Sequence, residues 1–297
     1  LNRYTDLQHP LLKKLQQNAP GTYQHSMTVA HLAQVVGEAI GANSLLLRIG
    51  AYYHDIGKME APKNFIENQF NSPNPHDLLD PWESTELIVN HVKSGIKIAM
   101  AAGLPRAVVD LIIQHHGTQL MEYFFNLAIK EQPRETLDEL DFRYPGPKPQ
   151  RHETAVLMLA DAVEAATRSL AKPTPSRIKE ITKQICDKRM LSGELDESNL
   201  TLSDLARIRS GLDEAHTELR SLLASFRAPI DRGGLVPALE KLTERFGQRT
   251  GLHVLFQNNC RPFELPAATE LQVTRIAQEA LTNIDRHEDA KNVRMCL

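Results

Sequence analysis

The sequence predicts a mainly α-helical protein with a smaller C-terminal part that mixes helix and strand. Apolar residues recur at the helical period of about 3.6 residues through most of the first 200 positions. Glycines stand where these runs stop, as at Gly41, Gly57 and Gly117. Beyond about residue 200 the composition changes, and HVLFQ at 253–257 has the β-branched and aromatic content of a strand.

The helices expected in the first part follow one another closely. They cover about 6–17, 22–40, 44–56, 83–102, 105–116, 118–131, 151–171 and 175–191. Two longer connections, 61–81 and 133–149, are rich in proline and polar residues. Loops of this length in a compact domain are more often functional than idle.

The second part begins with a long helix. Thr201 or Ser203 is its expected N-cap, and the helix runs on for about seven turns. A helix over about 234–250, the strand 253–257, a helix over 266–286 and a last strand near 292–297 follow. We expect that last strand to be left as an unpaired edge.

Composition sets the outer limits of function. A net charge of −3 gives no electrostatic case for a nucleic-acid polymer as partner. Three widely spaced cysteines without a CxxC pair indicate a reducing compartment, so we expect a cytoplasmic location. No apolar run approaches the roughly 20 residues that cross a bilayer, and the N-terminus does not resemble a signal peptide. Because the chain starts at Leu1, we expect it to be a piece of a longer protein.

A series of histidines and aspartates is the strongest functional signal. Its members are His25, His54, Asp55, His91, His115, His116 and Asp161. Imidazole nitrogen and carboxylate oxygen together suit Fe, Mn or Zn. Seven such groups are too many for one tetrahedral ion and about right for two ions that share a bridging carboxylate. The series therefore predicts a phosphate-cleaving metal centre.

Single members of this series are weaker evidence than the whole. Any one histidine is more often a satisfied polar group than a ligand. Asp161 lies in an otherwise apolar helix, where a buried carboxylate is costly unless it is paired or bound to metal. Asp141 is a nearby alternative to it.

The residues around these ligands resemble a known family. They are similar to the cytosolic HD domain of the seven-transmembrane HD family, whose members hydrolyse cyclic di-AMP to linear pApA. The resemblance covers about residues 1–211 and rests on APGTYQHSMTVAHLA, IGAYYHDIGKMEAPKNFIENQ, NPHDLL, HVKSGI, QHHGTQLMEYFF, MLADAVEAATRSL and LDESNLTLSDL. It implies an all-helical HD-domain bundle, the seven ligands above, two divalent ions (Mn or Fe) and a membrane-anchored parent protein.

The resemblance also implies roles outside the ligand set. Lys58 would neutralise a substrate phosphate, although a lysine there also suits the last carbonyls of a helix. Within the ligand set, the position of Asp55 beside His54 lets its carboxylate bridge two ions while the histidine holds one. Asn68, in the loop 61–81, would help to form the nucleotide cleft. For His76 in the same loop, substrate contact and plain solvation stay equally open.

Other functions remain as alternatives. The cyclic di-GMP branch of HD phosphodiesterases carries a GYP signature after its histidine pair, and this sequence has none. An HD phosphohydrolase acting on another nucleotide is a second alternative. The third is a non-catalytic module that senses a nucleotide and dimerises through the long helix at 202–226.

The C-terminal part, about 212–297, resembles a fragment of the nitrate/nitrite-type sensor histidine kinases. Glu279 and Asn283, four residues apart in QEALTNIDRHEDAKNV, match the N-box of that family and share one helical face. The phosphoacceptor helix and the glycine-rich lid of the family have no counterpart here. We therefore expect an incomplete ATPase-like α+β fragment with a vestigial N-box, no kinase activity and possible homodimerisation.

Overall fold

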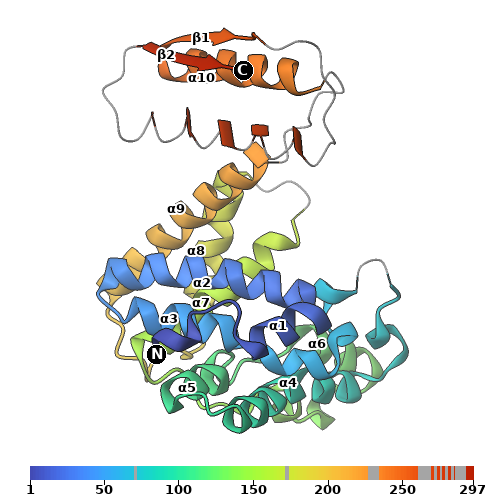
Figure 1. The fold of residues 1–297 in the computed structure, drawn as a ribbon. Helices are drawn as coiled ribbons and strands as arrows, with labels where there is room; N and C mark the ends of the chain where they lie inside the picture. The colour runs from blue at the N-terminus through green and yellow to red at the C-terminus, as the bar shows by residue number, and fades with distance from the viewer. Residues whose placement is uncertain are drawn as a thin grey trace. The chain divides into compact units, whose positions relative to one another are not determined.

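The computed structural model describes residues 1–69, 72–170, 174–226, 234–259 and 292–297, with scattered positions between 269 and 284. The chain divides into two compact units, Leu1–Leu219 and Arg220–Leu297. Each is described by itself. Within the described residues the first unit consists of helices joined by turns and loops, and the second contains helix and a small sheet (Figure 1). The mainly helical fold class expected from the sequence is confirmed.

The helices of the first unit begin close to where the sequence predicts them. Their bounds are α1 (Pro10–Asn18), α2 (Pro20–Ile40), α3 (Ser44–Tyr53), α4 (Pro81–Ala101), α5 (Arg106–Gln114), α6 (Glu122–Glu131), α7 (His152–Arg168), α8 (Pro175–Leu191) and the start of α9 (Leu202–Phe226). The side chains of Asn43, Asp80 and Thr174 cap α3, α4 and α8 by accepting hydrogen bonds from first-turn N–H groups. Proline begins α1, α2, α4 and α8, where its missing N–H costs nothing.

Helix α7 lies at the centre of the first unit. Every side chain from Thr154 to Asp161 is buried, so this helix has no solvent face along two turns. Around it pack α2, α3, α5 and α8, and α4 lies beside α5 (Figure 1). One continuous apolar core joins these helices and extends from Tyr4 to Ala215. Packing in this unit thus continues past residue 211, where the sequence placed a domain boundary.

The connections differ from expectation in detail. Helix α3 ends at Tyr53 rather than at 56, and the chain passes into a short 3-10 helix, η2 (Ile56–Glu60). The loop 61–81 contains η3 (Pro62–Asn64), η4 (Ile66–Asn68) and η5 (Pro75–Leu78). The second loop contains η6 (Arg134–Thr136) and η7 (Glu139–Phe142). These turns place polar side chains of both loops at fixed positions.

The second unit contains α10 (Leu235–Thr250), β1 (His253–Gln257) and β2 (Asn292–Cys296). The strands pair in parallel, with Val254 opposite Val293. The expectation of an unpaired last strand is therefore wrong, because β1 is its partner. In the helix expected over 266–286 the described positions are helical, whereas Glu279 and Asn283 lie outside the described residues.

Across the described residues, no helix combines the length and the apolar character that a membrane crossing requires.

Candidate metal centre

Two of the candidate ligands are neighbours at the end of α3. His54 is the C-cap of the helix and keeps helical backbone angles. Asp55 departs from them, with φ −108° and ψ 16°, as the chain enters η2. This change of direction lets adjacent side chains face the same interior point, which a continuous helix would prevent. Both residues are buried.

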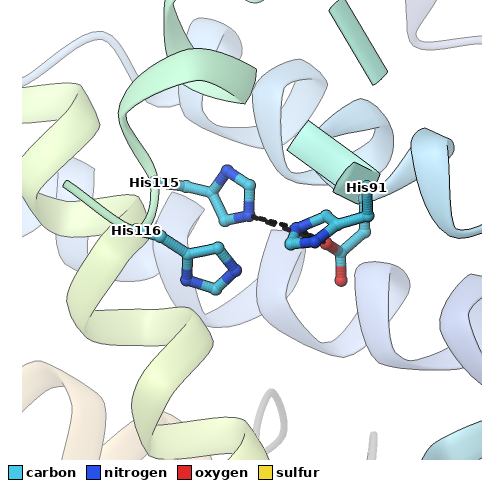
Figure 2. Close-up of side chains that lie close together, drawn as sticks. His91, His115 and His116 are labelled. Carbon is cyan, nitrogen blue, oxygen red and sulfur yellow. Dashed lines mark hydrogen bonds and ion pairs between the residues drawn. The ribbon is translucent and has the colours of Figure 1, made fainter. Parts of the chain in front are cut away.

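A second adjacent pair leaves the end of α5. His115 is the C-cap of that helix, and the chain turns at Gly117, where φ is +55°. A left-handed residue at this position suits glycine and turns the chain directly after the pair. Figure 2 shows His115 and His116 facing His91 of α4, and the Nε2 atoms of His91 and His115 are 3.4 Å apart.

Asp55 connects two groups of nitrogen ligands through its two oxygens. Oδ1 lies 3.4 Å from Nε2 of His91 and 3.6 Å from Nε2 of His115. Oδ2 lies 3.3 Å from Nε2 of His54 and 3.7 Å from Nε2 of His25. A carboxylate with one oxygen toward each group is what a bridge between two ions requires.

Asp161 completes the second group. Its Oδ1 lies 2.9 Å from Nε2 of His25 and 3.7 Å from Nε2 of His54. Two sets thus have ligand atoms within 4.8 Å of one another: Asp55 with His91, His115 and His116, and His25 with His54 and Asp161. The structure therefore brings together all seven side chains that the sequence singled out, whereas Asp141 is exposed on η7.

Three of the histidines are oriented in the same way. Nδ1 of His54, His91 and His115 bonds to the carbonyl oxygen three residues earlier, at 2.8, 2.6 and 2.8 Å. Because a carbonyl only accepts, Nδ1 carries the proton in each ring, and Nε2 points into the centre. Hydrogen bonds to the second nitrogen are the usual means by which proteins fix metal-binding histidines.

Two atoms at the middle of the centre make no hydrogen bond within the described part of the chain. They are Nε2 of His54 and Oδ1 of Asp55, both buried. Buried polar atoms almost always have a partner, and those without one often mark an ion or water site. The residues present therefore fit a divalent cation.

The charges of the clustered side chains follow from these contacts. Burial favours the neutral forms, but His54 and Lys58 outweigh it and hold the pKa of Asp55 well below its usual range. Burial likewise lowers the pKa of His54, yet Asp55 and Asp161 outweigh it and raise that pKa to about 10. For His91 burial wins and lowers the pKa to about 3. A cation that binds would therefore displace protons from some ligands and meet others already neutral.

Comparison with known proteins shows which family this chain resembles. A sequence model of the family described as HD domain matches residues 22–166. Two crystal structures of the HD domain of the Listeria monocytogenes phosphodiesterase PgpH, one in complex with cyclic di-AMP, are each 44% identical to this chain. Each superposes with a TM-score of 0.68 over 71% of this chain, which covers 99% and 97% of those chains.

The chain belongs to the HD-domain family. Of its two HD dipeptides, His54-Asp55 lies among the clustered side chains and His76-Asp77 lies in the loop 61–81. The curated cyclic-di-AMP phosphodiesterase PgpH of L. monocytogenes serotype 1/2a (strain 10403S) is 46% identical over 204 residues. That match takes in 69% of this chain and 28% of PgpH, so the chain spans little more than a quarter of that relative. The nitrate/nitrite sensor protein NarX of Escherichia coli (strain K12) is 30% identical over 145 residues, which are 48% of this chain and 24% of NarX.

Lys58 lies against Asp55 of the HD domain. Its Nζ is 2.7 Å from Oδ2 of Asp55 and 3.0 Å from Oε1 of Glu67. Burial alone would lower its pKa, but these two carboxylates outweigh burial and raise it, so the ammonium keeps its charge. Glu67 also accepts a hydrogen bond from Oγ1 of Thr22 at 3.1 Å and so ties η4 to α2.

The other two residues expected to contact substrate, Asn68 and His76, lie in the loop 61–81. The Oδ1 atom of Asn68 accepts hydrogen bonds from the N–H groups of Gly21 and Thr22, at 2.9 and 3.2 Å. Nε2 of His76 bonds to the carbonyl oxygen of Asn64 at 3.0 Å. Both side chains thus hold the loop in place in this structure. Their contact with substrate stays a prediction.

Sequence reasoning missed three residues of the HD centre. Glu67 holds Lys58, Glu164 contacts Nδ1 of His25, and Tyr144 stacks on His116 with ring centroids 4.2 Å apart. Glu164 follows Asp161 by three positions in the same apolar helix. The argument from a costly buried carboxylate therefore applied to both. Neither Glu67 nor Tyr144 carries such a signal, because each lies in an irregular segment.

Proposed function

We propose that residues 1–211 form a binuclear metal phosphodiesterase domain that hydrolyses cyclic di-AMP to pApA. The observation that carries the proposal is Asp55, with one oxygen toward each group of histidines. Such a bridge keeps two cations close enough to act on one phosphate. The names of the related proteins, including the HD domain crystallised with cyclic di-AMP, support the choice of substrate.

The seven clustered side chains are the proposed ligands of two divalent ions, for which Mn or Fe suits the mixture of imidazole and carboxylate. When bound, such ions would stabilise negative charge on a phosphodiester and make water nucleophilic near neutral pH. Carbonyl oxygens of Ala51, Ile88 and Ile112 hold three of the imidazoles in the required orientation. Because that support comes from helix backbone, the geometry is set before substrate arrives.

Lys58 is the proposed contact for the developing negative charge. Its side chain is 12% exposed, and Asp55 and Glu67 keep the ammonium charged. A fixed cation beside the reacting phosphate stabilises the equatorial oxygens of the transition state more than the ground state. Glu67 would keep the ammonium aimed at the centre. Asn68 and His76 are proposed to shape the nucleotide cleft with the loop 61–81.

The test is direct hydrolysis. The chain is loaded with Mn²⁺ or Fe²⁺, incubated with cyclic di-AMP, and the products are separated by chromatography. We expect pApA, and we expect its loss when His54→Ala and Asp55→Ala are combined. His31→Ala, an exposed histidine of α2, is the matched control and should behave as wild type. Absence of product from the metal-loaded chain would favour the nucleotide-sensing alternative, and cleavage of other nucleotides in preference would replace the substrate.

We further propose that the parent protein is anchored in a membrane with this domain on its cytosolic side. The identity to PgpH over a quarter of its length supports a longer parent. For residues 212–297 we propose a kinase-like fragment, which the identity to NarX supports. We further propose that this fragment has no kinase activity. Incubation with labelled ATP should give neither phosphorylated protein nor ADP. Light scattering would test the homodimer.

A further inference from the structure

One histidine of the HD centre is oriented differently from three others. Nδ1 of His54, His91 and His115 bonds to the carbonyl of its own helix. Nδ1 of His25 instead contacts Oε2 of Glu164, a carboxylate on another helix. Nε2 of the same ring lies 2.9 Å from Asp161. His25 is thus held between a candidate ligand and a carboxylate that lies outside both ligand groups.

Glu164 is placed for this contact by its position in α7. It follows Asp161 by three residues, so the two carboxylates lie on one helical face. Its side chain is 7% exposed. A buried carboxylate needs a partner, and the two partners recorded are His25 and Arg168, whose Nε is 3.6 Å away. The contact with Arg168 is longer than a hydrogen bond, and that side chain is 34% exposed, so His25 is the main partner.

We propose that Glu164 is a positioning residue that selectively holds the ion of the group formed by His25, His54 and Asp161. The inference rests on the proposed function, because it assumes two bound ions. A carboxylate that accepts from one ring nitrogen fixes the tautomer and makes the other nitrogen a stronger donor to metal. Within the described residues only His25 has such a partner among the histidines whose Nδ1 bond is recorded. The two ions therefore differ in their dependence on Glu164.

A purely structural role for Glu164 predicts a different result. If the carboxylate only stabilised α2 against α7, its loss would loosen the fold and weaken both ions alike. If it acts through His25, one ion is weakened and the other stays. Binding of the metal alone, without substrate, separates these cases.

The experiment titrates the full chain with Mn²⁺ and counts bound ions by elemental analysis at each free concentration. The variants are Glu164→Gln, which keeps shape and one acceptor oxygen, and Glu164→Ala, which removes both. We expect one ion to bind about 10- to 100-fold more weakly in Glu164→Gln, and more weakly again in Glu164→Ala, with the other ion unchanged. Glu153→Gln, at the half-buried start of the same helix and outside both ligand groups, is the control and should bind both ions as wild type.

His115→Ala identifies which ion is affected. That variant removes a ligand of the other group, so we expect it to lose the ion that Glu164→Gln retains, and the combined variant to lose both. Wild-type binding of both ions by Glu164→Ala would overturn the proposal, as would equal weakening of the two. If the wild-type chain itself binds no Mn²⁺, the proposed function fails first and this inference with it.

Discussion

At the scale of single residues, Asp161 lies at the meeting point of the two ligand groups. Its Oδ1 faces His25 and His54, and its Oδ2 lies 4.0 Å from Nδ1 of His116. Burial opposes its charge, but the contacts with His25 and His54 outweigh burial and hold its pKa well below the usual range. The carboxylate is therefore ionised and available to a cation at neutral pH.

Replacing this carboxylate should remove metal. We expect Asp161→Asn to bind Mn²⁺ at least about tenfold more weakly, because the amide nitrogen cannot ligate and the charge is lost. Elemental analysis after dialysis measures the effect. Asp141→Asn is the matched control and should retain both ions, since Asp141 is exposed on η7. Loss of ions from the control with none lost from Asp161→Asn would reverse the assignment.

The chemical types of the side chains allowed most of this centre to be predicted from the sequence. The seven candidate ligands are types that bind metal, and two pairs of them are adjacent, so their gathering could be predicted. The sequence alone left Asp161 and Asp141 as alternative metal ligands. The two aspartates lie close together in the chain, one in an apolar helix and the other in a polar loop. Only packing of α7 against α2 separates them, by bringing Asp161 to His25.

Cys186 provides a pH-dependent prediction away from the centre. The residue is fully buried in α8, and burial raises the pKa of its thiol to about 12. The thiolate is the reactive form, so a raised pKa keeps the group unreactive until the pH approaches 12. We expect iodoacetamide at pH 8 to 10 to label exposed Cys296 in the native chain and to spare Cys186. Peptide mass mapping checks this, with unfolded protein as the control in which both react.

At the scale of elements, the loop 61–81 completes a helix that lacks a cap of its own. The N-cap of α2 is Ala19, whose side chain accepts no hydrogen bond. Asn68 supplies the missing acceptor from η4 and donates to Oγ1 of Thr22 at 2.8 Å. Gly21 permits this approach, because a Cβ there would lie 1.9 Å from the carbonyl oxygen of Glu67. The loop and the helix that carries His25 therefore stabilise each other.

Removing this cap should lower stability. We expect Asn68→Ala to reduce the free energy of unfolding by about 1 to 2 kcal/mol, the usual effect of losing a helix cap. Urea denaturation followed by circular dichroism measures it. Asn90→Ala, at an exposed site of α4, should change stability by less than about 0.5 kcal/mol. Equal effects at the two positions would mean that the bonds from Asn68 to α2 contribute nothing.

Local sequence signals predicted some elements better than others. Helix α8 has the bounds expected from its pattern, 175–191, because proline begins it and its last turn runs into a glycine. Helix α3 ends earlier than its apolar run, because His54 and Asp55 turn toward the centre. The pairing of β1 with β2 could not be predicted, since the strands lie far apart in the chain and nothing local records their contact.

At the scale of the molecule, all seven candidate ligands lie in the first unit, between residues 25 and 161. The core of that unit also takes in the start of α9, where Leu212 and Ala215 are 0% and 3% exposed. His216 of the same helix is buried and its Nε2 lies 2.6 Å from Oγ1 of Thr167. The segment that resembles the family, about 1–211, is therefore shorter than the packed first unit.

Two truncated chains test where this unit ends. A chain ending at Leu219 keeps the contacts of α9 with the core, and we expect it to bind Mn²⁺ and to unfold as the first unit of the full chain does. A chain ending at 211 loses the burial of Leu212, worth about 1.5 to 3 kcal/mol, and the contact of His216 with Thr167. We expect it to unfold at clearly lower urea concentration. Its metal ligands are intact, so any ions that it loses are lost through destabilisation, and excess Mn²⁺ should restore part of its stability. Equal urea midpoints for the two chains would place the end of the unit at 211 and leave the buried residues of α9 without an energetic role.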